Sequence, residues 1–198
     1  ASGDVALMAM NTSNIAVVSQ NTGDVEVFDI TIIYNPARIN RINNVQGHSF
    51  SDIVLTNTSM VLLAEDRVLY GNPSSADLSE LTLDTSVLGE VKGLVAVADA
   101  LVIYFERGLE VRDAADPGRL LNSWQIADDI IATAVESDRW LMVTTDTTLH
   151  LLDKRRLIAN VGDSLVGSIP LQELPSSTLS VSGDLLIAAN GATWQIYD

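Results

Sequence analysis

The chain has 198 residues and carries 26 acidic side chains against 11 Lys and Arg, a formal net charge of −15 at pH 7. Nucleic acids and anionic lipid headgroups bind clustered Lys and Arg, so this charge disfavours both as partners. The chain has no cysteine, which excludes disulfides and thiolate metal sites.

Apolar residues make up 47% of the chain and come in short runs rich in Val, Ile and Leu, interrupted by polar turn residues. This texture is typical of strands and turns. The longest runs, 94–98 and 100–105, fall far short of the roughly 18 residues of a transmembrane helix. No basic segment followed by an apolar one opens the sequence, so we expect a soluble chain whose signal peptide is absent or already removed.

Taken in chain order, the elements repeat one unit of strands and polar turns. An Asn-Thr-Ser turn at 11–13 precedes the apolar run 15–18, and the same letters return at 57–59 before 60–63, 46 residues later. The turn markers of the five units are Ser13, Ser59, Asp99, Asp138 and Gly183. Their spacing of 39 to 46 residues is the length of a β-propeller blade.

A second marker runs in phase with the first, because an Asp closes the third strand of four units. These residues are Asp29, Asp113, Asp153 and Asp198. The continuous apolar run of each second strand predicts burial on both faces, between neighbouring blades. Apolar and polar residues alternate in the third strand, as in Val25 and Val27 around Glu26, and this predicts that one face of the strand is exposed to solvent.

Together the two markers predict an all-β fold, a five-bladed β-propeller with about four antiparallel strands in each blade. A single domain spans 1–198, with blades at 5–45, 52–83, 93–126, 130–171 and 178–198. Outer fourth strands are expected at 38–45, 78–83, 120–126 and 165–171. No helix of ten or more residues is expected, and the nearest candidate is a helical turn at 75–83.

The last blade is short of one strand, since its third strand ends at Asp198 and only four residues precede the first strand of the chain. A closed propeller commonly completes its last blade with a strand from the opposite terminus. We therefore expect an incomplete, three-stranded blade at 178–198, unless the chain is a fragment. Its edge strand, with Trp194, Ile196 and Tyr197, is the expected site of self-association or partner capture by β-addition.

The segment 108–117, Gly-Leu-Glu-Val-Arg-Asp-Ala-Ala-Asp-Pro, resembles the LVIVD-type propeller repeat, in which a Gly-Leu strand ends in Asp and Asp-Pro follows. Val25–Asp29 with Asn35-Pro36 is a looser copy. Proteins with such repeats are mostly secreted or surface-attached in bacteria and archaea. The resemblance implies an adhesion or scaffold role and an extracellular, cell-surface or periplasmic location.

Carboxylates gather in the loops that a propeller places at one end of its blades. The candidate cation-binding or partner-binding residues are Asp24, Glu65, Asp66, Glu106, Asp128, Asp129 and Asp146. Converging carboxylates attract cations and ligate calcium through oxygen, so calcium is the one cofactor that the pattern allows. No spacing resembles an EF-hand, and a solvated acidic rim is the competing interpretation.

Basic residues fall near the turns at the other end of the blades. They are Arg38, Arg41, Arg112, Arg119, Lys154, Arg155 and Arg156. Either the two ends of the fold differ in charge, or each Arg pairs with a local Asp such as Asp113, Asp116 or Asp153 and contributes little.

The sequence contains no recognisable catalytic motif, since it lacks a nucleophile elbow and its two histidines are an expected loop residue, His48, and a strand residue, His150. We expect a non-catalytic binding or scaffold module whose partner is a protein or a glycan. The alternative is a carboxylate-dependent glycan hydrolase that uses the acidic face, because paired carboxylates from different blades leave no local motif. The Asn-Thr-Ser sequences at 11–13 and 57–59 also fit N-glycosylation, although turn formation explains them first.

Overall fold

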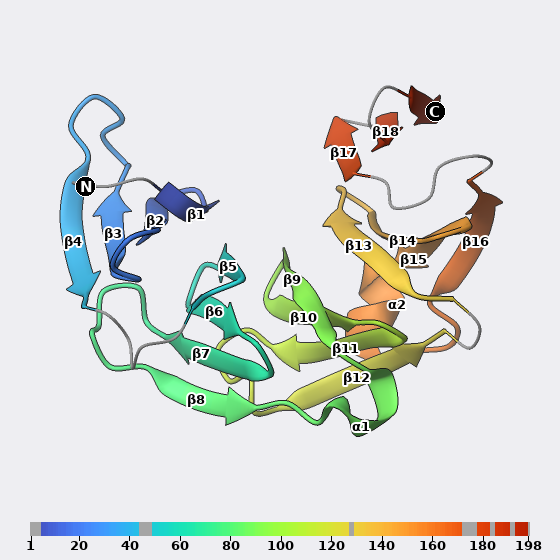
Figure 1. Cartoon of the computed structure of the whole chain (residues 1–198), viewed down its shortest axis with the longest axis horizontal. Helices are drawn as coiled ribbons and strands as arrows, with labels where there is room; N and C mark the ends of the chain where they lie inside the picture. Colours follow the sequence, from blue (N-terminus) through green and yellow to red (C-terminus); the bar gives the residue numbers. More distant parts are fainter. Residues whose placement is uncertain are drawn as a thin grey trace. The chain divides into compact units, whose positions relative to one another are not determined.

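Figure 1 shows the computed structural model, which describes residues 5–43, 49–126 and 129–171 and, beyond them, the backbone of 178–182, 185–190 and 193–197. The chain divides into two compact units. The first consists of Ala1–Asp84 and Ala114–Gly118, and the second of Thr85–Asp113 and Arg119–Asp198.

The first unit contains two four-stranded antiparallel sheets, in which each strand pairs with the next along the chain. The first sheet consists of β1 (Val5–Met10), β2 (Asn14–Ser19), β3 (Val25–Asp29) and β4 (Ala37–Ile42). The second consists of β5 (Asp52–Leu55), β6 (Met60–Ala64), β7 (Arg67–Gly71) and β8 (Ser79–Thr82).

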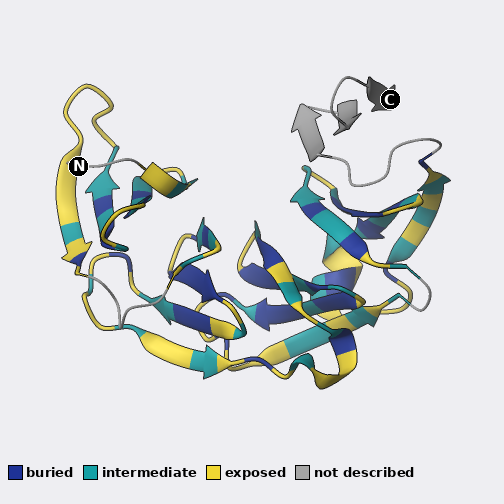
Figure 2. Cartoon of the chain, viewed as in Figure 1, coloured by how far each residue is buried: buried dark blue, intermediate teal, exposed yellow. Residues whose placement is uncertain are grey.

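An aliphatic core fills the space between these two sheets. It includes Ala16, Val18, Val25 and Val27 from the first sheet and Ile53, Leu55, Met60 and Leu62 from the second. Strand β6 is buried over its whole length (Figure 2). The two-sided burial predicted from the apolar run 60–63 is thus confirmed.

The second unit repeats the same antiparallel arrangement. One sheet consists of β9 (Val91–Val97), β10 (Ala100–Phe105), β11 (Gly108–Asp113) and β12 (Leu120–Gln125), and the next of β13 (Ile131–Glu136), β14 (Trp140–Thr145), β15 (Thr148–Asp153) and β16 (Leu165–Pro170). A three-stranded sheet follows, with β17 (Thr178–Ser182), β18 (Leu185–Asn190) and β19 (Thr193–Tyr197). Two short helices are α1 (Thr85–Leu88) and α2 (Lys154–Ala159).

The core of the second unit lies between its two four-stranded sheets. It includes Val97, Val102, Leu109 and Val111 from one sheet and Ile131, Leu141, Val143 and Leu152 from the other, with Leu157 of α2 beside them. Among the described residues, neither helix has the length and apolar character needed to cross a membrane.

The predicted strand pattern is confirmed in the described part of the chain. Four sheets have four antiparallel strands with the outer strand in its expected place, and 178–197 contributes three strands, as the strand count predicted. The helical turn expected at 75–83 is wrong, because 79–82 is the extended strand β8, which pairs with β7. Helix α2 was not predicted. Its run of basic residues is equally typical of an exposed turn. The helix is stabilised by its N-cap Asp153 and by the burial of Leu157.

Two residue types of the repeat have clear physical reasons. Gly108 begins β11 where a Cβ atom would lie 2.4 Å from the carbonyl oxygen of Trp124, so only glycine fits against β12. The strand-ending Asp holds the following turn through its side chain. Asp29 accepts a hydrogen bond from the backbone N–H of Thr31 at 2.8 Å, and Asp153 accepts one from that of Arg155 at 2.9 Å.

The spacing of the first two units is 45 residues in the structure, one fewer than their matching letters indicate. Met10 pairs with Ile15 as Leu55 pairs with Met60. In the first turn the side-chain oxygen of Asn11 accepts the backbone N–H of Asn14 at 2.8 Å. In the second turn the hydroxyl of Thr56, not the side chain of Asn57, accepts the corresponding bond, from the N–H of Ser59 at 2.9 Å.

Candidate functional site

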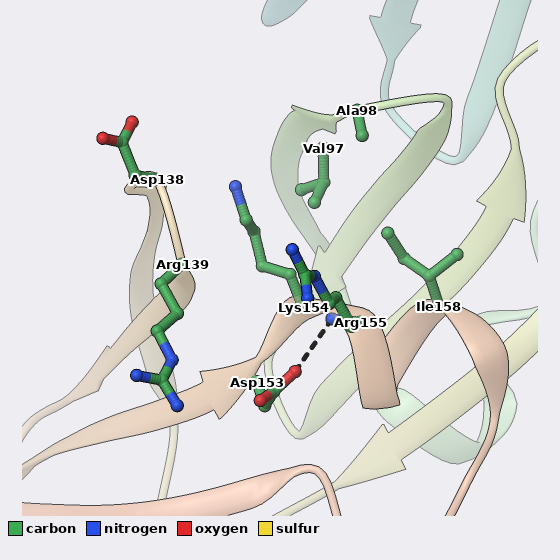
Figure 3. Close-up of a pocket in the computed structure, with 8 residues that line it drawn as sticks. All are labelled: Val97, Ala98, Asp138, Arg139, Asp153, Lys154, Arg155 and Ile158. Carbon is green, nitrogen blue, oxygen red and sulfur yellow. Dashed lines mark hydrogen bonds between the residues drawn. The ribbon is translucent and has the colours of Figure 1, made fainter.

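A pocket of about 570 Å³ lies in the second unit, at the ends of its two four-stranded sheets (Figure 3). The turn between β9 and β10, the turn between β13 and β14, and the start of α2 surround it. Its lining residues are Val97, Ala98, Asp138, Arg139, Asp153, Lys154, Arg155 and Ile158. The pocket is therefore built from equivalent turns of two neighbouring sheets together with the start of the helix that connects β15 to β16.

Helix α2 forms the basic side of the pocket. Asp153 is its N-cap, and the side chain accepts the backbone N–H groups of Arg155 and Arg156. The hydrogen bond from Arg156 is the main reason why the pKa of Asp153 lies below its ordinary value, so this residue stays a carboxylate. At the other end Asn160 has a left-handed φ of 53° and donates its N–H to the carbonyl of Arg156. These caps, with the buried Leu157, fix the helix that presents the basic side chains.

The three cations of the pocket differ in how they are held. Lys154 is largely buried and donates to Glu136 at 2.6 Å and to the carbonyl of Ser137 at 2.5 Å. The guanidinium of Arg139 lies 4.4 Å from the centre of the Trp140 ring, a cation–π contact. Arg155 is exposed, and its guanidinium has no ion pair among the described residues. In Figure 3 the Lys154 side chain extends from the start of α2 towards the turn that carries Asp138 and Arg139, and Arg155 lies below Val97.

The charges of the lining are nearly balanced once the ion pairs are counted. Lys154 is paired with Glu136 outside the lining, and Arg139 and Arg155 lie in the lining with Asp138 and Asp153. The cation that is open to a ligand is Arg155, whose guanidinium has no ion pair among the described residues. Val97, Ala98 and Ile158 add apolar surface beside the charges. Such a lining can hold an anionic group next to an aliphatic one.

The backbone at the rim of the pocket is held in an uncommon conformation. Ala98 has a φ of 52°, in the left-handed region that a residue with a Cβ atom seldom adopts. Equivalent turns of neighbouring blades lie at the same end of the fold. The repeat spacing in the sequence could therefore have indicated that the two turns of the pocket lie close together. The markers Asp99 and Asp138 identified both turns, but not the helix that completes the lining.

Of the predicted acidic residues, Asp24 and Glu106 are engaged in ion pairs. Asp24 is 8% exposed and accepts the Arg41 guanidinium at 2.7 Å, which raises the pKa of Arg41. Glu106 lies 3.4 Å from the amino group of Lys92, which also contacts Glu90 at 2.7 Å. Asp24 and Glu106 therefore take part in ion pairs within the chain, at a turn and at a strand end.

The remaining acidic candidates lie in separate turns. Glu65, with a φ of 56°, and Asp66 form the tight turn between β6 and β7. Asp129 accepts the hydroxyls of Thr145 at 3.2 Å and Thr147 at 2.9 Å, while Asp146 is exposed in the turn before β15.

Neither the expected metal site nor the expected edge site is fully described. Asp128 lies outside the described residues. Among those described, no group of three or more His, Asp or Glu side chains is placed to hold a metal ion. Strand β19 is the terminal strand of its sheet, as expected of an edge, but the side chains of Trp194, Ile196 and Tyr197 lie outside the description. Binding at the acidic loops and at β19 stays a prediction.

The basic residues pair mostly with glutamates of the same or a neighbouring strand, and less with the local Asp residues that were one of the two expectations. Arg119 does lie 3.5 Å from Asp113. Arg112, however, contacts Glu110 at 2.7 Å, and Arg38 contacts Glu26 at 3.0 Å. In strands, residues two apart or directly opposite are the nearest partners on one face, and this geometry brings glutamates within reach.

His150, expected within a strand, lies in β15 between the two four-stranded sheets of the second unit. Its ring is 5.7 Å from that of Trp124, and its Nδ1 lies 2.9 Å from the hydroxyl of Ser168. Its Nε2 is buried without a hydrogen-bond partner among the described residues. Burial lowers the pKa of His150, with a smaller opposing effect of Asp129, so the ring is neutral at pH 7.

No protein-family model matches this sequence, and no curated protein matches it. Solved structures do resemble the fold. The computationally designed Ika8 protein has a TM-score of 0.72 at 14% identity, over 98% of this chain and 58% of that chain. A chain of a mitotic checkpoint complex has a TM-score of 0.67 at 16% identity, over 98% and 62%. Hsv2p of Kluyveromyces lactis has a TM-score of 0.65 at 12% identity, over 95% and 64%.

These likenesses define the class of the fold. The checkpoint-complex chain and Hsv2p are β-propellers, and the four antiparallel four-stranded sheets described above are the blades of such a fold. This chain is thus an all-β protein of the β-propeller class. It spans about three fifths of the length of the three chains, and at these identities the likeness is one of fold alone.

Proposed function

We propose that this chain is a non-catalytic binding or scaffold module, a five-bladed propeller whose pocket beside α2 holds an anionic segment of a partner protein. The observation that carries the proposal is the exposed guanidinium of Arg155, which has no ion pair among the described residues and lines a pocket of about 570 Å³. The fifth blade of the proposal is the three-stranded sheet β17–β19.

Charge favours an anionic occupant over a neutral glycan. The exposed guanidinium of Arg155 is open to a carboxylate, and a guanidinium binds a carboxylate through two parallel hydrogen bonds. Arg139 adds positive potential from a position held by its contact with Trp140, which costs less ordering on binding than a mobile side chain would. Because the rest of the chain is acidic, the pocket would also orient an anionic partner during its approach.

The location is also a proposal. We propose an extracellular, cell-surface or periplasmic module with LVIVD-type repeats, supported by the resemblance of 108–117 and by the acidity of the chain. Hsv2p and the checkpoint-complex chain support only the propeller scaffold of this proposal. Calcium binding at the acidic loops has no group of three or more described ligands in its support.

Short peptides that combine Asp or Glu with aliphatic residues test the pocket, with matching Asn and Gln peptides for comparison. We expect the acidic peptides to bind, and Arg155→Ala to weaken them about tenfold. Binding should also weaken as salt is raised from 0.05 to 0.5 M, about the range over which screening becomes strong.

The matched control is Arg119→Ala, which removes an exposed Arg that pairs with Asp113 outside the pocket. Fluorescence anisotropy should give it the affinity of the parent chain. Equal losses for both variants would mean that net charge alone attracts the peptides. Indifference to Asp and Glu would contradict the proposal.

A further inference from the structure

Two side chains of α2 bring a cation and an aliphatic group to the same wall of the pocket. Arg155 and Ile158 lie three residues apart on this helix, and both line the cavity. Residues three apart on a helix are neighbours, with about 5–6 Å between their Cβ atoms. Figure 3 shows Ile158 extending from α2 towards the turn of Val97 and Ala98. A ligand that meets the guanidinium of Arg155 therefore also meets an aliphatic surface.

The aliphatic surface of the pocket is small and is held in place by the second unit. Ile158 is partly buried, because it packs against the core of this unit, and only the rest of its side chain is left for a ligand. Ala98 is exposed in the turn between β9 and β10 and lines the same pocket. Such a surface fits one aliphatic side chain better than a long apolar segment.

The charges of the pocket fit a ligand with one carboxylate better than a ligand with several. Arg155 has no ion pair among the described residues, whereas the amino group of Lys154 is held by Glu136. Asp138, in the same lining, is an exposed carboxylate and repels a second anion. The net charge of −15 likewise opposes a partner segment with many acidic residues. A ligand with a single negative charge avoids most of this repulsion.

The last residue of a protein combines these two features, because its carboxylate and its side chain are attached to the same carbon atom. In an extended internal segment, by contrast, an acidic side chain and the side chain of the next residue point to opposite faces. An internal acid would therefore reach Arg155 with its neighbouring aliphatic side chain turned away. The volume of about 570 Å³ lies within the range of about 300–1,000 Å³ that encloses a compact ligand, and a chain end is such a ligand.

We propose that the pocket binds the C-terminus of a partner protein whose last residue is Val, Leu or Ile. The terminal carboxylate accepts two parallel hydrogen bonds from the guanidinium of Arg155, and the last side chain packs on Ile158 and Ala98. This inference rests on the proposed function, since it names the anionic group that the same pocket holds. It adds two requirements to negative charge, a free chain end and an aliphatic last side chain.

Fluorescence anisotropy with short peptides, labelled at the N-terminus and otherwise uncharged, tests the proposal. One peptide ends in Leu with a free carboxylate, and its amidated form lacks only that charge. We expect amidation to weaken binding at least about tenfold in the parent chain and to have no effect in Arg155→Ala, because both changes remove the same contact. Replacing the last Leu by Gly should weaken binding of the free peptide about tenfold, through lost apolar burial.

The matched control is Arg156→Ala, which removes the neighbouring exposed Arg of α2 outside the pocket lining and should keep the full effect of amidation. Equal weakening by amidation in the parent chain and in Arg155→Ala would place the carboxylate elsewhere and overturn the proposal. Equal affinities for peptides ending in Leu and Gly would also overturn it. If amidation has no effect while amidated peptides with internal Asp or Glu bind, this inference fails and the proposed function stands. If neither kind of peptide binds, both fail.

Discussion

Strands β2 and β6 occupy equivalent places in neighbouring sheets and carry similar apolar runs, yet they differ in burial. All five residues of β6 are buried, whereas β2 buries only Ala16 and Val18, which point to one face. Strands β10 and β14 resemble β6, each with all but one residue buried. A continuous apolar run therefore indicates that a strand can be buried on both faces, while the burial itself requires a neighbour on each.

The largest effect is expected at the covered strand. Leu62 of β6 is fully buried between the first two sheets, so Leu62→Ala should lower the free energy of unfolding by about 3 kcal/mol, the usual range for a buried Leu being about 2–5. Urea denaturation followed by circular dichroism measures this change. A loss below 1 kcal/mol would mean that β6 has room to collapse around the cavity.

Gly108 and Gly167 both lie in strands of the second unit, but only Gly108 has neighbouring atoms close to the position that a Cβ would take. Gly108→Ala should cost about 2 kcal/mol, because the new Cβ would meet the carbonyl oxygen of Trp124 and force β11 from β12. Gly167 in β16 has no atom within 4 Å of the equivalent position, so Gly167→Ala should be neutral or slightly stabilising. Equal thermal shifts for the two variants would contradict the close approach at Gly108.

The partly buried His150, between two sheets of the second unit, should make the stability of the chain depend on pH. Its pKa is lowered from 6.5 in the folded chain, mainly by burial, so the unfolded chain binds the proton more readily. The contribution of a neutral His150 to stability is fully present above pH 6.5 and is lost as the pH falls through the lower folded pKa. Urea midpoints between pH 8 and 5 should therefore fall less steeply for His150→Gln than for the parent chain. If the urea midpoints of both chains fall equally with pH, groups other than His150 cause the loss of stability.

The smallest effect is expected at the uncovered side of β2. Val17 is the equivalent of Leu62 but lies on the face of β2 opposite Ala16 and Val18, so Val17→Ala should lower the free energy of unfolding by less than about 1 kcal/mol. Urea denaturation of the two variants under the same conditions measures the difference. A loss as large as that of Leu62→Ala would remove the contrast in burial between β2 and β6.

The sequence predicted the strands well because their signals are local. Runs such as 100–105, polar turns and the strand-ending Asp depend on residues close in the chain, and each sheet is a meander of consecutive strands. Helix α2 escaped prediction because its six residues depend on the cap by Asp153 and on the burial of Leu157, and the second of these is a tertiary contact.

The candidate site was harder to predict than the strands. Arg139 and Lys154 were visible as charges, but the pocket exists only because two turns from neighbouring sheets meet beside α2. Likewise, the sequence does not show that Asp24 pairs with Arg41 or that Glu106 pairs with Lys92, so both carboxylates were expected to be available for binding. Contacts between residues far apart in the chain carry no signal in a single sequence.

The Asp at the end of the third strand also has a consequence for how the connections of this fold can vary in length. Asp29 closes its turn locally before the connection to β4, and Asp153 does the same at the start of the longer connection to β16. Because the end of β3 is already held, residues of the connection to β4 can be added at little cost to the sheet, since closing a loop twice as long costs only about 0.6 kcal/mol. The connection to β16 differs, because its Leu157 is buried in the core. The connection from β3 to β4 is therefore the natural position for grafting a foreign peptide, and the first sheet would serve as a frame for displaying it.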